Sequence, residues 1–434
     1  MKDRAKLIDT AKNLVIVVLL LSAIFLLLKA VVINPKSTFE SIGGFFGRNS
    51  AAGTVSPQSN ESTENAASPV FLLITTEDGS HYAVKYDIQV KNKIISQFSG
   101  YLGEALGSSS SLHKITVEQW QEVLSGTGVF FDYLYPQPLS AIASWLGTSV
   151  TNEAANKTAR RLFLGNDNGN LILYFMSESD GNIYSCKTAR SFSSLSPKIA
   201  EYPLGTASFA FELDPEYANL DPYFIFSRES KTLQAITAST PVRDSTFDSY
   251  AMLSYFGMNS HVVSEHTEAD GSEVFVDGDK TLRIEASGKA SFSVSGSTGV
   301  QLIENSEASS ISDYISAFCK IAKNSVGLNS GDAVVGLVNI NDKDFPSSCT
   351  ISFGYFADGI PFTLPGGKYA AYFEVSNGTL VKAELYFRKY SFSGGSTIAL
   401  PEKQVTAIVE AKGGEPVLTY EDKTDSVVCS WIIK

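Results

Sequence analysis

The chain has 434 residues, a formal net charge of −12, and only 18% charged residues. Its hydrophobic and aromatic contents of 44% and 11% are sufficient for folded cores, and the length predicts more than one domain, since domains hold about 100–200 residues. Proteins that bind nucleic acid need basic patches, so the acidic balance argues against nucleic acid as a partner. It also disfavours attachment to an anionic membrane surface by charge alone.

An apolar stretch near the N-terminus predicts a membrane anchor. Residues 14–33 read LVIVVLLLSAIFLLLKAVVI, and a membrane-spanning helix needs about 18 or more mostly apolar residues. Four basic residues precede it, so the positive-inside rule predicts a cytoplasmic tail at residues 1–13 and an extracytoplasmic location for the rest. The alternative is a cleaved signal peptide, which the length of the run and the absence of a small-x-small cleavage site disfavour.

One face of the predicted anchor carries small and polar side chains. This face contains Ser22, Ala23, Leu26, Lys29 and Ala30, because residues three, four or seven positions apart lie on the same side of a helix. Small residues let helix backbones approach closely, and a serine hydroxyl can donate a hydrogen bond across a helix pair in lipid. We interpret this face as a contact with another membrane helix. A featureless anchor is the alternative, because no small-xxx-small motif is present.

Residues 34–68 are rich in Ser, Asn, Gly, Thr and Ala, a composition that predicts a flexible linker. A first domain is predicted at residues 69–242. It is expected to begin with a hairpin around the turn EDGS, followed by a helix from about Val90 to Ala105 and a helix that Thr116 and Gln119 cap. A strand GVFFDYLYP and a short helix from Pro138 to Gly147 come next. Three antiparallel strands follow, with turns at 166–169 and 180–182.

Two further domains are predicted at residues 243–306 and 307–434, each with a helix followed by strands. In the first, Ser245 and Asp248 form a loose capping box for the helix FDSYAMLSYFG, and three strands follow in a meander. In the second, Ser310 and Asp313 cap a helix, and two or three strands follow. The predicted last helix begins at Pro401, with Val405, Ile408 and Val409 buried, and a final strand pair is PVLTYE and SVVCSWIIK. Helices and mostly antiparallel strands in separate blocks predict an α+β fold.

No sequence motif indicates catalysis. The chain lacks a G-x-S-x-G elbow, an H-E-x-x-H motif and a P-loop. A pair of catalytic carboxylates, as in glycosidases, stays an open alternative, because spacing in the sequence does not give the distance between two side chains in the fold. His261 and His266, with Glu265 and Glu268, are a weak metal candidate, since five-residue spacing does not put both rings on one helical face. We therefore expect that the protein is not an enzyme and that it binds no metal and no cofactor. Asp-Gly pairs are better explained as hairpin turns than as calcium loops; they begin at Asp78, Asp180, Asp270, Asp277 and Asp358.

The chain has four widely spaced cysteines and no CxxC pair; they are Cys186, Cys319, Cys349 and Cys429. This spacing gives little support to a metal site or a redox motif. Apolar neighbours in AFCKIA and SVVCSW favour four small buried hydrophobic side chains.

Several stretches resemble the YycH family, the membrane-anchored regulators of the WalK sensor histidine kinase in Gram-positive bacteria. The family's helix, Asp-Gly turn and leucine-bearing strand are similar to residues 252–294, MLSYFGMNSHVVSEHTEADGSEVFVDGDKTLRIEASGKASFSV. Its strand ending in Gly-x-Pro resembles ISFGYFADGIPF, and its closing tyrosine and tryptophan strands resemble LTYEDKTDSVVCSWIIK. Its N-terminal ectodomain resembles GVFFDYLYPQPLSAIASWL, a match that favours YycH over the shorter relative YycI.

The resemblance extends over most of residues 69–434 and implies a non-enzymatic, single-pass membrane protein with a three-domain ectodomain. Its implied partners are a WalK-like kinase and a YycI-like protein, in a complex that regulates cell-wall homeostasis. The alternative function is binding of a cell-wall polysaccharide or peptide. Tyrosines that could stack against sugars are Tyr369, Tyr372, Tyr386 and Tyr390, beside Phe373 and Phe387. Burial of these rings in a two-sided sheet is the simpler explanation.

Overall fold

A computed structural model describes residues 68–205, 207–213, 217–227, 233–296, 299–303, 310–409 and 413–434. These residues belong to one compact unit, Ser59–Lys434. The predicted tail, the anchor at 14–33 and the linker up to residue 67 lie outside the described residues. Within the described ranges, no helix is long and apolar enough to cross a membrane.

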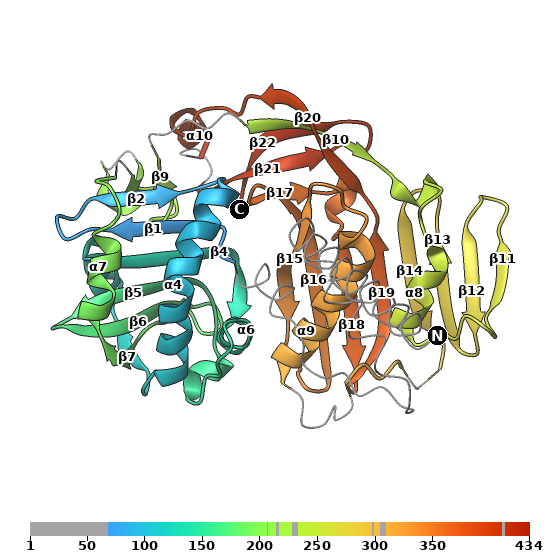
Figure 1. The fold of residues 1–434 in the computed structure, drawn as a ribbon, viewed down its shortest axis with the longest axis horizontal. Helices are drawn as coiled ribbons and strands as arrows, with labels where there is room; N and C mark the ends of the chain where they lie inside the picture. Colours follow the sequence, from blue (N-terminus) through green and yellow to red (C-terminus); the bar gives the residue numbers. More distant parts are fainter. Residues whose placement is uncertain are drawn as a thin grey trace, which may run out of the picture. The chain divides into compact units, whose positions relative to one another are not determined.

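The first sheet has seven strands in the order β2-β1-β4-β5-β6-β7-β3 (Figure 1), and every neighbouring pair is antiparallel. The strands are β1 (Phe71–Thr75), β2 (His81–Val84), β3 (His113–Ile115), β4 (Gly128–Pro138), β5 (Thr158–Asp167), β6 (Asn170–Ser177) and β7 (Ile183–Ser191). Long runs of β1, β4 and β5 are buried on both faces, which explains why these strands read as continuous apolar stretches. The predicted hairpin and the predicted three-strand meander are confirmed.

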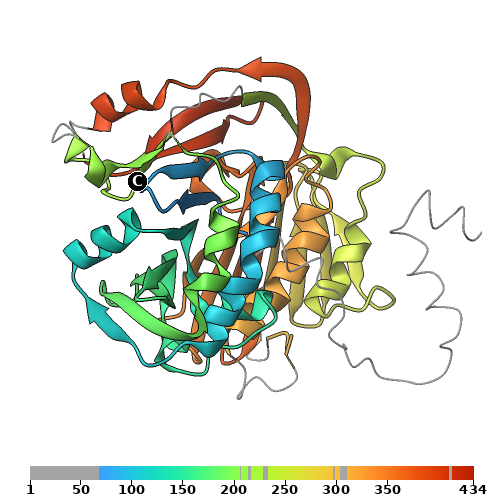
Figure 2. The same ribbon diagram turned by 60° about the vertical axis from the view of Figure 1, so that its left-hand side comes forward.

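Three helices accompany this sheet: α4 (Ile88–Ser108), α5 (Val117–Ser125) and α6 (Leu139–Trp145). The capping box predicted for α5 is present, because the Thr116 hydroxyl accepts from the Gln119 N–H while the Gln119 side chain accepts from the Thr116 N–H. Helix α4 contacts β6 and β7, and α6 contacts both α4 and α9 (Ile311–Ala322). Figure 2 shows α4 along the face of the first sheet.

The rest of the predicted first domain consists of short elements. They are α7 (Ser196–Ile199), β8 (Ser208–Phe209), β9 (Ile225–Phe226) and β10 (Leu233–Ser239). Strands β8 and β9 pair with each other, and β10 pairs with β20 (Lys389–Thr397). The 3-10 and π turns of the described chain are η1 (Glu153–Asn156), η2 (Phe192–Ser194), η3 (Ala210–Glu212), η5 (Pro241–Arg243), η6 (Ser254–Phe256), η8 (Lys323–Gly327) and η9 (Pro365–Gly367).

The second sheet has eleven strands, in the order β11-β12-β13-β14-β19-β18-β16-β17-β21-β22, with β15 also paired to β16. The pairing is antiparallel except between β17 and β21. The strands are β11 (Ser264–Thr267), β12 (Glu273–Asp277), β13 (Lys280–Ile284), β14 (Lys289–Val294), β15 (Val334–Asn341), β16 (Ser348–Ala357), β17 (Ile360–Thr363), β18 (Ala371–Ser376), β19 (Thr379–Tyr386), β21 (Pro416–Asp422) and β22 (Val427–Ile433). The predicted boundary at residue 306 lies between β14 and β19, which pair within this sheet.

The inner face of the second sheet packs on α8 (Ser249–Leu253), η6 and α9 (Ile311–Ala322). The Phe318 ring stacks on Phe373 and the Phe256 ring on Phe292, each with centroids 4.5 Å apart. Because side chains alternate along a strand, the neighbouring positions of β14, β18 and β19 project from the opposite face. Helix α10 (Glu402–Val409) packs near β21.

The structure corrects four details of the predicted elements. Asp248 itself caps α8 by accepting from the Ala251 N–H, in place of a capping box with Ser245. Residues 349–392, which were predicted to hold two or three strands, hold the five strands β16 to β20. Strand β15, which precedes them, was not predicted. Ile408 is 49% exposed, whereas Val405, Thr406 and Val409 are buried, so Ile408 lies on the side of α10 that faces away from the core.

All five Asp-Gly pairs lie in turns between strands, and each glycine has a positive φ. This left-handed backbone favours glycine, which has no Cβ. The prediction of hairpin turns is confirmed.

Candidate functional site

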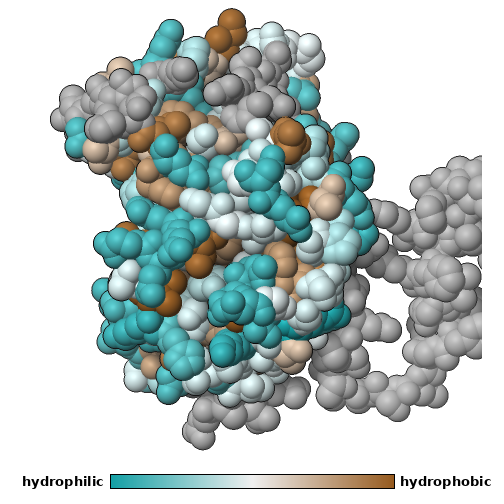
Figure 3. Space-filling view, turned by 90° about the vertical axis from the view of Figure 1, so that its left-hand side faces the viewer, coloured by the Kyte–Doolittle hydropathy of each residue, from teal (hydrophilic) through white to brown (hydrophobic). Residues whose placement is uncertain are grey.

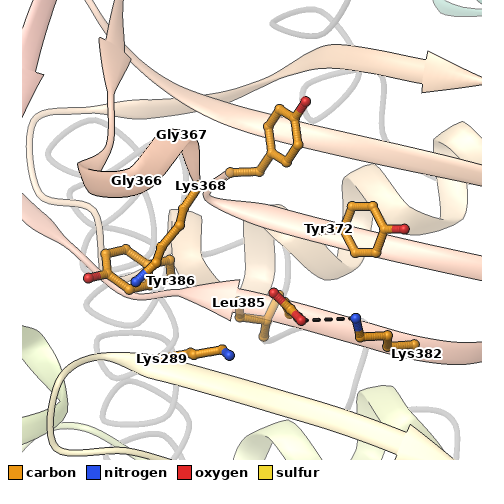
Figure 4. Close-up of a pocket in the computed structure, with 10 residues that line it drawn as sticks. Lys289, Gly366, Gly367, Lys368, Tyr372, Lys382, Leu385 and Tyr386 are labelled. Carbon is orange, nitrogen blue, oxygen red and sulfur yellow. Dashed lines mark ion pairs between the residues drawn. The ribbon is translucent and has the colours of Figure 1, made fainter.

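The outer face of the second sheet carries a pocket of about 290 Å³, which we call the tyrosine–lysine pocket. Its walls come from β14, β18, β19 and the η9 turn (Figure 4). The residues that line it are Lys289, Gly366, Gly367, Lys368, Tyr369, Tyr372, Lys382, Glu384, Leu385 and Tyr386. Three lysines, three tyrosines and one carboxylate therefore share one small surface.

Sheet register brings these side chains together. Tyr372 of β18 lies directly opposite Glu384 of β19, and Tyr386 of β19 lies opposite Lys289 of β14. Paired positions on one face of a sheet hold their Cβ atoms about 4.5–5.5 Å apart. Strand pairing thus fixes two tyrosines, one lysine and the carboxylate.

The η9 turn places Lys368 over the pocket. Gly366 and Gly367 have φ of +72° and +68°, a backbone that residues with a Cβ rarely adopt. The Tyr386 N–H donates to the Ala370 carbonyl at 2.8 Å, which ties the loop after the turn to β19. The Lys368 Nζ lies 4.4 Å from the centroid of the Tyr386 ring, and Figure 4 shows this side chain reaching across to that ring.

Electrostatics in the pocket centre on Glu384. Its carboxylate is 3.0 Å from the Lys382 Nζ. The hydrogen bond from Lys382 lowers the pKa of Glu384 most, and the charges of Lys289 and Lys368 lower it further. One carboxylate thus faces three ammonium groups, in a chain whose net charge is −12.

Three of the four tyrosines that the sequence indicated line this pocket, but Tyr390 does not. Tyr390 is 1% exposed and donates a hydrogen bond to Asp422 at 2.8 Å, so it belongs to the core. Phe373 and Phe387 are fully buried, as the simpler explanation had it. Sequence reasoning missed the lysines, although Lys382, Glu384 and Tyr386 alternate along β19. The candidate anchor residues, from Ser22 to Ala30, lie outside the described residues.

A second charge cluster, which the sequence did not indicate, is buried. We call it the Arg160 network. The Arg160 guanidinium binds Asp132 of β4 through two hydrogen bonds of 2.7 and 2.8 Å, and binds both carboxylate oxygens of Glu415. The exposed side-chain fractions are 11% for Arg160, 3% for Asp132 and 10% for Glu415. Arg161 joins the network through Asp132 and Asp221.

The Arg160 network links β4 and β5 of the first sheet to the start of β21. Burial alone would raise the pKa of Asp132, but the charges of Arg160 and Arg161 outweigh it and lower that pKa. Nearby, the Lys434 Nζ lies 3.8 Å from the centroid of the Tyr135 ring. All the charges in this network have partners, so we assign it a structural role.

Among the described residues, His81, His261 and His266 do not form a catalytic arrangement. The buried His81 ring contacts the Thr75 hydroxyl and the Glu212 carboxylate, each at 2.9 Å, but Thr75 is fully buried and cannot meet a substrate. His261 and His266 are exposed, and the described residues include no group of three or more His, Cys, Asp or Glu side chains that could hold a metal ion.

The prediction for the cysteines is confirmed: all four are free and buried. Burial raises the pKa of the Cys186, Cys349 and Cys429 thiols to about 12, so they stay protonated at neutral pH.

The surface on the side of the first sheet is mostly hydrophilic. Figure 3 shows this side, with small, separate apolar patches among polar residues. Isolated apolar side chains are normal on a surface and do not mark a docking site. The tyrosine–lysine pocket is therefore the strongest candidate site in the described part of the chain.

No family model matches the sequence, and no curated protein matches it. Among solved structures, the chain is similar to the crystal structure of YycH from Bacillus subtilis, with a TM-score of 0.52 and 13% sequence identity. The similarity covers 87% of this chain and 96% of that chain. It therefore extends over both sheets, and the chain has a YycH-like fold.

Proposed function

We propose that this protein is a non-enzymatic, membrane-anchored regulator of a sensor histidine kinase. The observation that carries the proposal is the YycH-like fold, which covers 87% of the chain. The proposed arrangement has the N-terminus in the cytoplasm, residues 14–33 in the cell membrane, and the folded unit outside. The proposed partners are a WalK-like kinase and a YycI-like protein, in a complex that acts in cell-wall homeostasis.

The proposed contact with the kinase is made by the anchor. Its candidate face contains Ser22 and Ala23, whose small side chains allow a second helix to approach closely. In lipid, interhelical hydrogen bonds of polar side chains contribute about 1 kcal/mol each. Replacing both residues with leucine would remove the hydroxyl and fill the contact while keeping the segment apolar.

A membrane pull-down tests this proposal. The full-length chain is captured from its host beside a version in which an unrelated transmembrane helix replaces residues 14–33, and partners are identified by mass spectrometry. We expect the native anchor to recover a sensor kinase and the replacement to lose it. Ser22→Leu with Ala23→Leu should also reduce recovery, whereas Val17→Leu with Ile24→Leu, on the opposite face, should not.

The outcomes separate fold from function. Equal recovery of a kinase by both anchors would keep the regulator proposal and move the contact to the folded unit. Recovery of no kinase by either version would overturn the proposal and leave the YycH-like architecture as a shared fold only.

A further inference from the structure

We propose that the tyrosine–lysine pocket binds an anionic saccharide, with a sugar ring against the tyrosines and its carboxylate or phosphate group beside Lys289 and Lys368. This inference does not depend on the regulator proposal, because it concerns a small-molecule site on the folded unit. It follows from the charge, the rings, the strand pairing and the size of the pocket.

The charge of the pocket favours an anion. Lys382 is paired with Glu384 at 3.0 Å. Lys368 lies over the Tyr386 ring, and no ion pair of Lys289 or Lys368 is found within the described ranges. Two ammonium groups, one from β14 and one from the loop after η9, therefore remain available in the pocket. An anionic group placed there would form charge-assisted hydrogen bonds, which are stronger than those between neutral groups.

The rings favour a sugar over a bare anion. Tyr369 is 38% exposed, and Tyr372 and Tyr386 are half-buried, so all three keep accessible ring surface. Tyrosine combines an apolar ring with a polar hydroxyl, which suits the apolar C–H face and the hydroxyl rim of a pyranose. The Glu384 carboxylate can accept hydrogen bonds from sugar hydroxyls.

Strand pairing disfavours a peptide that would bind as an added strand. This mode of recognition needs a free sheet edge. Strands β14, β18 and β19 are each paired on both sides, so the backbone around the pocket has no free edge. A ligand must contact side chains and the η9 turn.

The size of the pocket favours a small ligand. Its volume of about 290 Å³ lies just below the roughly 300–1,000 Å³ typical of small-molecule sites. One or two sugar rings fit this space, whereas a folded partner protein would need a far larger surface. A terminal or branching residue of a longer glycan would also fit, because the pocket is open to the surface.

Isothermal titration calorimetry on the purified full-length chain tests the proposal. The probes are trigalacturonic acid, which carries carboxylates, phosphorylated maltotriose, and neutral maltotriose. We expect at least one anionic probe to bind at least about tenfold more tightly than maltotriose, a difference of about 1.4 kcal/mol. The tighter anionic probe identifies the preferred acid. Its binding should weaken as salt is raised, because exposed charges are screened.

Variants separate the contributions of the charges and of the rings. Lys289→Gln with Lys368→Gln should reduce the affinity for the anionic probe about tenfold or more, while Lys114→Gln, at an exposed lysine of β3, should leave it unchanged. Tyr386→Leu should weaken binding of the anionic sugar but not of inorganic phosphate, which has no ring to stack. Circular dichroism spectra that match the unmodified chain exclude misfolding as the cause.

Three results would overturn the proposal. They are absence of binding by both anionic probes at millimolar concentration, equal affinity for maltotriose, and an equal loss of affinity in Lys114→Gln. Each of these results is independent of whether the chain recovers a kinase.

Discussion

The Arg160 network and the tyrosine–lysine pocket both place cations beside carboxylates, but the two clusters differ in burial and in balance. The Arg160 guanidinium is 11% exposed and binds two carboxylates. In the pocket, the Lys382 and Glu384 side chains are 47% and 40% exposed, and two more lysines lie nearby. One cluster is buried and fully paired, and the other is open and carries excess positive charge.

This difference separates structure from binding. Removing one partner from a buried network leaves a charge without compensation in a low-dielectric environment, which is costly. Water screens exposed charges, so their loss changes stability little, but they stay accessible to a ligand. We therefore expect mutations in the Arg160 network to affect folding and mutations in the pocket to affect binding.

The largest expected effect is that of Arg160→Met. The change removes the closer of the two arginine partners of Asp132 and Glu415, and leaves both carboxylates buried with the longer contacts of 3.4 Å to Arg161. We expect the free energy of unfolding to fall by about 3–5 kcal/mol, the usual range when a buried ion pair loses one partner. Urea denaturation of the purified chain at neutral pH measures this loss.

The matched control for this prediction is Arg190→Met. Arg190 also pairs with a carboxylate, Glu104, but the two side chains are 40% and 49% exposed. Exposed ion pairs contribute about 0–1 kcal/mol. Similar losses for Arg160→Met and Arg190→Met would show that burial does not distinguish the two pairs, and would contradict the structural role of the network.

A smaller effect, of opposite sign, is expected from Lys91→Met. Lys91 of α4 is 5% exposed, and burial lowers its pKa to about 8 although the charge of Asp358 opposes this shift. Below pH 8 the folded protein carries a buried ammonium that the unfolded chain keeps in water. Methionine removes this cost. The free energy of unfolding at pH 7 should therefore rise by about 1–3 kcal/mol, since one pKa unit corresponds to about 1.4 kcal/mol.

The pH dependence gives this prediction a second measurement. Between pH 8 and the ordinary lysine pKa of 10.5 the unfolded chain binds more protons, so the stability of the unmodified protein should rise with pH. The advantage of Lys91→Met should therefore shrink from pH 7 to pH 9.5. Lys93→Met, at an exposed position of the same helix, should stay within about 0.5 kcal/mol of the unmodified chain at both values. A constant advantage across this range would mean that ionisation of Lys91 is not its cause.

Local sequence signals predicted most of the elements. Thr116 and Gln119 marked the start of α5 because a capping box involves only residues three apart. The Asp-Gly pairs marked hairpins because the positive φ is a local property of glycine. Strand β15 was missed, and its run VVGLVNIN has an interior glycine, Gly336, which weakens a strand pattern.

The sites depend on long-range contacts, which sequence patterns do not give. Alternation along β18 and β19 was enough to indicate Tyr372 and Tyr386. Lys289 joins them only through the pairing of β14 with β19, across almost a hundred residues. The contact of Arg160 with Glu415 spans 255 positions, so no spacing rule could have predicted it.

Apart from the control variants, the smallest expected effect on stability is that of Lys382→Gln in the tyrosine–lysine pocket. The free energy of unfolding should change by less than about 1 kcal/mol, because the pair with Glu384 is exposed. The pKa of Glu384 should rise toward its ordinary value, since the hydrogen bond from Lys382 is the main cause of its lowering. Lys289→Gln should raise the same pKa by a smaller amount, because Lys289 acts through its charge alone. A carbon-detected NMR titration of the Glu384 carboxyl measures both shifts. If Lys289→Gln left that pKa unchanged, Lys289 would exert no field at the centre of the pocket, and the excess charge that distinguishes the pocket from the Arg160 network would have to come from Lys368 alone.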